Sequence, residues 1–197
     1  MQKEHKKLNE TEIEGKIEKI LEILKLMDNK DLFEIQYKGL LIKRLLIFKN
    51  FDEDIERSFL KNLTTICGAA SITKYYSFFN DIKISNQHFK DFQEKFQTDP
   101  DISKVQIEVV SQGIWSLGEN IDENFEIPNE VSNVINSYER FYLGKHPERK
   151  IKWICDMGVA VVRANFKERV RDLIVNNLQM FVLLCFNNQR KSSCCKI

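Results

Sequence analysis

The sequence lacks the motifs that mark the commonest nucleotide-binding and metalloenzyme sites. It contains no Gly-x-x-x-x-Gly-Lys phosphate loop, no Gly-x-Gly-x-x-Gly turn and no His-Glu-x-x-His pair. None of its three histidines, His5, His88 and His146, is paired with a cysteine or an acid at ligand spacing. We therefore predict no catalytic residue, no metal and no cofactor, and a binding or scaffold protein rather than an enzyme.

Long apolar runs and an excess of one charge are also missing. The most apolar run, residues 178–186, is far too short to cross a bilayer. The formal net charge is only +1, so the chain as a whole is not drawn to nucleic acid or acidic lipid. Five cysteines without a Cys-x-x-Cys pair, and no apolar leader behind Met1, favour a reducing intracellular compartment. We predict no membrane partner.

The cysteines have two interpretations. Cys67, Cys155 and Cys185 stand in apolar surroundings, where a thiol usually packs as a small hydrophobic group. The alternative is a cysteine-dependent enzyme, which would require Cys155 to lie near His146.

Both ends of the chain are interpreted as flexible tails. Residues 1–10 are rich in charge. Residues 189–197 end in Cys194-Cys195-Lys196-Ile197, which superficially resembles a prenylation signal. Because Lys196 stands where an aliphatic residue is expected, an unstructured tail is the preferred interpretation.

Amphipathic helical patterns fill residues 11–97. Thr11 and Glu14 have the form of a capping box, and Asp52 is placed to cap a third helix that ends at Gly68. Ser85 is a candidate cap between a fourth and a fifth helix. With short loops between these patterns and no strand among them, we predict a helical bundle.

Strand patterns appear only after the turn-rich segment 97–101, so residues 98–188 are predicted to form a small mixed α/β domain. Pro128 opens a helix and Gly144 is placed to stop it. An apolar helix is predicted over residues 177–186, giving an α+β fold class overall. Alternating apolar residues predict strands at residues 105–109, 151–154, 159–166 and 172–175.

Two basic surfaces are candidate contacts for an acidic partner. A solvated face is the ordinary explanation of both, and core packing explains the aromatic residues beside the second as well as nucleic-acid stacking would. A basic adaptor for nucleic acid or a membrane surface stays open as an alternative. The surfaces comprise Lys38, Lys43, Arg44 and Lys49, and Lys145, His146, Arg149, Lys150 and Lys152.

Several blocks of the chain, in order, resemble the carboxy-terminal region of the cullins, the scaffold subunits of multisubunit ubiquitin ligases. The resemblance is nearest to the type-four subfamily, although Ile114 replaces the aromatic residue usual before the tryptophan. The blocks are Asp31-Leu32-Phe33-Glu34 with Tyr37 and Lys43-Arg44-Leu45-Leu46; Cys67-Gly68-Ala69-Ala70 with Thr73-Lys74, Phe79 and Asp81; Gly113, Trp115 and Pro128; residues 141–153; and residues 181–187.

The resemblance implies a non-catalytic scaffold whose α/β domain accepts a strand from a RING-box protein, which in turn recruits a ubiquitin-conjugating enzyme for ubiquitin-dependent degradation in cytoplasm and nucleus. It also implies a basic surface for the acidic tail of the conjugating enzyme, for which Lys38, Lys43 and Arg44 are the candidates. The candidate RING-binding residues are Val105, Ile107, Val109, Trp115, Trp153, Val161 and Phe166.

Two parts of a full cullin have no counterpart in the sequence, so we expect a form truncated at both ends. The adaptor-binding helical repeats are missing, and so is the winged-helix domain with its modification lysine. No lysine here is assigned that role, and the sequence names neither substrate nor adaptor. A competitor that sequesters the RING subunit and the cullin-homology subunit of the anaphase-promoting complex are alternatives.

Overall fold

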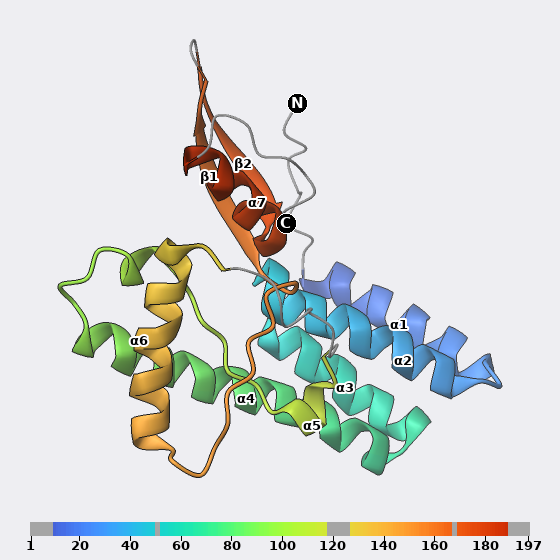
Figure 1. The fold of residues 1–197 in the computed structure, drawn as a ribbon. Helices are drawn as coiled ribbons and strands as arrows, with labels where there is room; N and C mark the ends of the chain where they lie inside the picture. Colours follow the sequence, from blue (N-terminus) through green and yellow to red (C-terminus); the bar gives the residue numbers. More distant parts are fainter. Residues whose placement is uncertain (1–9, 50–51, 118–126, 167–168, 189–197) are drawn as a thin grey trace. The chain divides into compact units, whose positions relative to one another are not determined.

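The computed structural model describes residues 10–49, 52–117, 127–166 and 169–188 (Figure 1). The chain forms two compact units, residues 1–80 and 81–197. One long helix, α4 (Ala69–Lys95), contributes its first part to one unit and its second part to the other. The tails predicted at residues 1–10 and 189–197 lie outside the described residues, except that Glu10 begins the first helix.

The first unit is helical, as predicted. It contains α1 (Glu10–Leu26), α2 (Lys30–Lys43) with a π-helical turn (Arg44–Phe48), α3 (Glu53–Cys67) and the start of α4. Aromatic rings meet at its centre, where Tyr37 packs edge-on against Tyr75 with 5.3 Å between ring centroids. The fully or nearly fully buried side chains include Leu24, Leu41, Leu45, Leu60, Leu63, Ile72, Tyr75, Phe78 and Phe79.

Local signals for helix ends were partly correct. Asp52 caps α3, since its Oδ1 accepts the N–H groups of Asp54 and Ile55. Gly68 ends that helix with φ of 87°, a backbone conformation that favours glycine. The capping box predicted at Thr11 is wrong, because α1 already begins at Glu10. The apolar period that starts at Ile13 does not determine where the first turn begins.

The break predicted at Ser85 is also wrong, because α4 continues through it for 27 residues. Ser85 is completely buried in the middle of this helix. Serine favours helix starts because its hydroxyl can bond to nearby backbone. Here the hydroxyl bonds instead to a distant segment of the chain.

The second unit begins with an aromatic layer between α4 and α6 (Asn129–Lys145). Pro128 immediately precedes α6, as its position predicted, whereas Gly144 lies inside the helix, which ends one residue later. Short helical turns, η2 (Ile102–Lys104) and α5 (Gln112–Trp115), lie between α4 and α6 in the chain. The buried core cluster is Phe89, Phe92, Ile102, Ile107, Val134, Tyr138, Phe141 and Tyr142.

A β-hairpin and a helix complete this unit. Strands β1 (Val159–Asn165) and β2 (Val170–Asn176) pair antiparallel, with Val162 opposite Leu173, and α7 (Asn177–Asn188) packs on both. The predicted hairpin strands and terminal helix are therefore confirmed, and with them the α+β class. Among the described residues the sheet has only these two strands, so the strands predicted at 105–109 and 151–154 are wrong.

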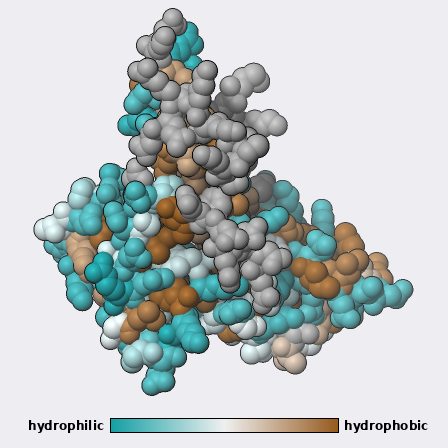
Figure 2. All heavy atoms as spheres, viewed as in Figure 1, coloured by the Kyte–Doolittle hydropathy of each residue, from teal (hydrophilic) through white to brown (hydrophobic). Residues whose placement is uncertain are grey.

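Apolar side chains are also exposed on the first unit. They occupy the ends of α1 and α2 around the turn that joins them, where Figure 2 shows apolar residues gathered on the surface. We call this set the α1–α2 apolar patch. None of the described helices is long and apolar enough to cross a membrane. The patch consists of Ile20, Ile23, Leu26, Met27, Leu32 and Ile35.

Candidate strand-binding site

Two segments without helix or strand structure lie against the α4–α6 core. The first extended segment (residues 105–111) precedes α5, and the second extended segment (residues 149–155) leads from α6 toward β1 (Figure 1). Val105 has the dihedral angles of a strand, −115° and 150°. Ile107 belongs to the buried cluster itself. Val105, Val109, Ile151 and Trp153 pack against that same cluster.

The alternation of apolar residues in both segments therefore reports burial on one side rather than membership of a sheet. A strand requires a hydrogen-bonded neighbour as well as the right side-chain pattern. Within the part of the chain that the structure describes, neither segment has such a neighbour. The candidate site therefore consists of two extended segments on one apolar layer, neither of which is hydrogen-bonded to a neighbouring strand in the described part of the chain.

Side chains of α4 hold the first extended segment. The hydroxyl of Ser85 accepts the N–H of Val109 at 2.7 Å and donates to Oε2 of Glu108 at 3.0 Å. One helical turn earlier, Oδ2 of Asp81 accepts the N–H of Ser111 at 3.1 Å and the indole Nε1–H of Trp115 at 2.9 Å. Trp115 is completely buried, so it anchors the segment and offers no surface of its own.

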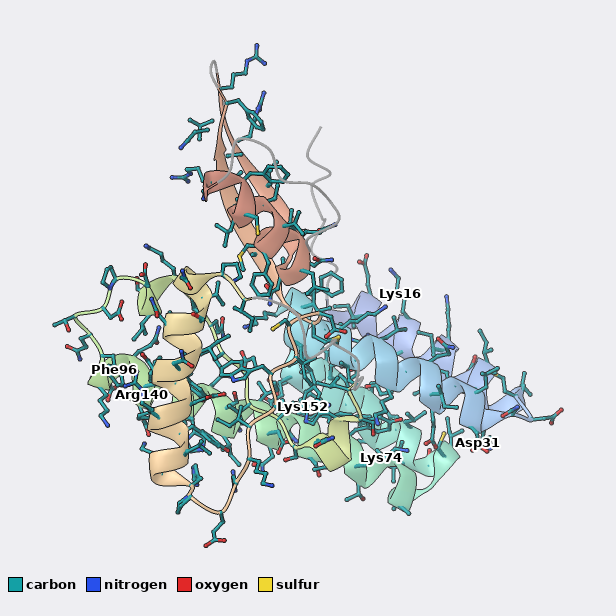
Figure 3. All side chains as sticks on the ribbon, in the orientation of Figure 1. Lys16, Asp31, Lys74, Phe96, Arg140 and Lys152 are labelled. Atoms are coloured by element: carbon teal, nitrogen blue, oxygen red, sulfur yellow. The ribbon has the colours of Figure 1, made fainter. Side chains whose placement is uncertain are left out.

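Side chains of α6 hold the second extended segment in a similar way. The indole Nε1–H of Trp153 donates to Oε1 of Glu139 at 2.6 Å, and its ring lies edge-on to Tyr138. Arg149 donates from Nη1 to the hydroxyl of Tyr142 at 2.8 Å. Lys152 projects from the same segment (Figure 3). Both segments are thus fixed by polar contacts to a helix as well as by apolar packing.

Three buried polar atoms of this layer have no hydrogen-bond partner within the described residues: the hydroxyl of Tyr138, Nδ1 of His88 and Nε2 of His146. Burial, with Tyr142 and Glu108 nearby, raises the pKa of Tyr138 above its ordinary value. The rings of His88 and His146 lie edge to face, 5.1 Å apart. Burial is the main cause that lowers the pKa of His88, and the neighbouring His146 adds to it.

The predicted hairpin residues are exposed. Val161 on β1 is 67% exposed and Phe166 at the end of that strand is 60% exposed. On the same face, Val161 pairs with Ile174, while Arg163 and Asp172 form an ion pair at 3.0 Å. This face therefore offers apolar surface next to an ion pair.

The three predicted basic residues differ in their surroundings. Arg44 pairs with Oε1 of Glu56 at 2.5 Å, and its guanidinium lies over the ring of Tyr37. Its charge is therefore balanced by contacts within the first unit. Lys38 lies over the ring of Phe78 at 5.9 Å. Lys43 is exposed at the end of α2. Of the three, Lys43 has the surroundings that an electrostatic contact with a partner requires.

Nothing in the described chain favours metal or thiol chemistry. Within the described ranges, no three histidine, cysteine or acidic side chains are grouped as a metal site. Burial raises the pKa of Cys155, and Asp156 raises it further, which is opposite to the change that activates a nucleophilic thiolate. Cys194 and Cys195, with the prenylation-like tail, lie outside the described residues.

Comparison with known proteins identifies the family. The model of the cullin alpha solenoid domain matches residues 1–88, and that of the cullin alpha+beta domain matches residues 109–197. The chain belongs to the cullin family. The two matched regions follow one another in the chain and are separated by residues 89–108. The second region contains the second extended segment and the end of the first.

Individual cullins match along nearly the whole chain. Cullin-4A of Mus musculus is 33% identical over 186 residues, Cullin-3 of Dictyostelium discoideum 31% over 188, and Cullin-3A of Arabidopsis thaliana 32% over 192. These alignments cover 93%, 94% and 95% of this chain, and 24%, 24% and 26% of the relatives. The chain thus spans about a quarter of the length of these cullins. Their similar identities leave the type-four assignment a prediction.

Sequence reasoning identified the apolar side of this site but not what holds it. Ser85 was interpreted as a helix cap and Asp81 only as part of a family block, although both bond to the first extended segment. Their spacing of four residues places them on one face of α4. A serine and an aspartate at that spacing among the buried aromatic residues of a helix were the signal that could have been used.

Proposed function

We propose that this cullin chain is a non-catalytic scaffold that binds a RING-box protein through its α/β half and so supports ubiquitin-dependent protein degradation. The observation that carries the proposal is the pair of extended segments, which lie on one apolar layer and have no hydrogen-bonded neighbouring strand among the described residues. Strand addition suits such a site, since main-chain hydrogen bonds provide affinity and alternating side chains fix the register.

Family membership supports the same partner, because cullins resemble one another in using this region to hold a RING subunit. In this proposal the RING subunit recruits the ubiquitin-conjugating enzyme, and the chain supplies no catalytic group. We expect the complex in cytoplasm and nucleus. The matched models and the relatives named above are all cullins, so neither the anaphase-promoting-complex subunit nor the basic adaptor is favoured.

Co-expression of the full chain with a RING-box protein tests the proposal, followed by pull-down and an autoubiquitination assay with a conjugating enzyme. We expect a stable one-to-one complex that forms ubiquitin chains. If a chain that is folded by circular dichroism does not bind, the scaffold proposal is wrong.

A matched pair of variants tests whether the hairpin contributes. Val161 on β1 and Ile35 on α2 are each 67% exposed, so replacing either with lysine costs little stability. We expect Val161→Lys to weaken the RING-box complex and Ile35→Lys to leave it unchanged. Equal effects of the two would show that the hairpin face is not part of the contact.

A further inference from the structure

The first extended segment is bonded to α4 at alternate residues. The N–H groups of Val109 and Ser111 donate to Ser85 and Asp81, respectively. In an extended chain the backbone groups of successive residues point to opposite edges, so residues two apart share an edge. The edge that carries the N–H groups of residues 109 and 111 therefore faces α4.

By the same alternation, the backbone groups of Gln106 and Val110 point to the opposite edge. That edge is directed away from Asp81 and Ser85. The segment thus has two unlike edges. One is occupied by the side chains of a helix, and on the other neither Gln106 nor Val110 makes a backbone-to-backbone hydrogen bond within the described residues.

We infer that Asp81 and Ser85 form a clamp that takes the place of a neighbouring strand on one edge of residues 105–111, and so directs the other edge to the partner's strand. The α4 clamp, as we call this pair, deepens the proposed function and rests on it. Asp81 and Ser85 are positioning residues, which need not touch the partner. In this arrangement the partner's strand forms hydrogen bonds with the backbone of Gln106 and Val110. It does not bond to the backbone of Val109 or Ser111, which α4 already holds.

The clamp is built into the core rather than added at the surface. Ser85 is completely buried, and its hydroxyl both accepts a hydrogen bond and donates one. The carboxylate of Glu108 that it contacts also accepts from Nε2 of Gln106 at 2.9 Å. A segment fixed in this way before binding loses less conformational freedom when a strand is added, which increases affinity.

The partner's strand has a defined chemistry in this arrangement. It is extended, and it offers backbone N–H and C=O groups to the open edge. Side chains that it directs toward the α4–α6 layer meet the partly buried apolar residues packed on that layer, such as Val109, Ile151 and Trp153, so they are apolar or aromatic.

Hydrogen exchange of individual amides in the full chain provides the first test. In the free chain we expect slow exchange at Val109 and Ser111 and faster exchange at Gln106 and Val110. Addition of a RING-box protein should slow exchange at Gln106 and Val110. Uniform exchange along residues 106–111 in the free chain, or protection by the partner at Val109 and Ser111 alone, would overturn the inference.

Variants of the clamp provide the second test, with affinity for a RING-box protein as the readout. Ser85→Ala removes the acceptor for Val109, and we expect about fivefold weaker binding, the effect of one lost hydrogen bond. Ser85→Thr keeps the hydroxyl and should restore most of the affinity. Ser58→Ala makes the same chemical change at an exposed helical position, on α3, and serves as the control.

The outcomes separate this inference from the function on which it rests. If the unaltered chain binds and Ser85→Ala binds equally well, the clamp is wrong and the scaffold stands. If Ser85→Ala weakens binding but Ser85→Thr does not restore it, buried packing rather than the hydroxyl is responsible, and the clamp is again wrong. If the folded, unaltered chain does not bind, the proposed function fails and this role of the clamp fails with it.

Discussion

At the residue scale, the hydroxyl of Tyr138 is buried in the α4–α6 core and has no hydrogen-bond partner within the described residues. A buried polar group without a partner costs free energy, so its removal should not destabilise the fold. We expect Tyr138→Phe to leave the free energy of unfolding unchanged or to raise it by up to about 1 kcal/mol in urea titrations.

Tyr142→Phe is the matched control for that substitution. It removes a hydroxyl that accepts a hydrogen bond from Arg149 in the same aromatic layer. We expect it to lower the free energy of unfolding by about 1 kcal/mol. A larger loss for Tyr138→Phe than for Tyr142→Phe would show that the Tyr138 hydroxyl has a partner after all.

The depressed pKa of His88 predicts how stability depends on pH. Burial is the largest cause of the lowered pKa. The positive charges of His146, Lys145 and Arg149 lower the pKa further, and the carboxylate of Asp91 raises it. Below the ordinary value of 6.5, the unfolded chain therefore binds more protons than the folded chain at this site. The contribution of His88 should be constant above about pH 6.5 and should decrease as the pH falls toward the folded pKa.

Thermal unfolding between pH 7.5 and 5 measures this effect. We expect the midpoint to fall less steeply for His88→Gln than for the unaltered chain, because the substituted side chain does not titrate. Parallel curves would contradict the assignment of this pH dependence to His88.

At the element scale, two glycines that look alike in sequence should respond in opposite ways to the same change. Gly68 ends α3 with φ of 87° and ψ of 155°, and Gly39 lies inside α2; neither has an atom within 4 Å of an added Cβ. Backbone strain should make Gly68→Ala cost about 1–3 kcal/mol. Gly39→Ala should stabilise the helix by about 0.5–1 kcal/mol. Chemical denaturation of both variants tests the pair, and a loss of stability in Gly39→Ala would contradict it.

The elements that the sequence predicted well are those whose own residues determine them. Helices α1 to α3 follow from apolar residues at helical spacing, and β1 and β2 from two alternating runs joined by a short turn. The errors occurred where a partner elsewhere in the chain decides the structure. Ser85 was mistaken for a cap because the residue it contacts, Val109, is 24 positions away. Residues 105–109 have the side-chain period of a strand, which carries no information about a hydrogen-bonded neighbour.

At the scale of the whole molecule, the small net charge confines electrostatic attraction to local surfaces. If the exposed lysine at the end of α2 attracts a conjugating enzyme, Lys43→Glu should slow ubiquitin-chain synthesis most at low ionic strength. Lys61→Glu reverses an exposed lysine on α3 and is the control. Rates that are equal for the two variants at low salt would remove Lys43 from the proposed contact. Arg44 is unsuitable for this test because reversing its charge would also break its pair with Glu56.

The α1–α2 apolar patch has a consequence for how the isolated chain behaves in solution. Leu26 is 85% exposed, and Ile23 and Ile35 are each more than 60% exposed. A formal charge of +1 supplies little electrostatic repulsion between copies to oppose the attraction between these surfaces. Osmotic second virial coefficients measured near neutral pH should accordingly be negative, and one basic substitution in the patch, which removes apolar surface and also raises the net charge, should make them less negative.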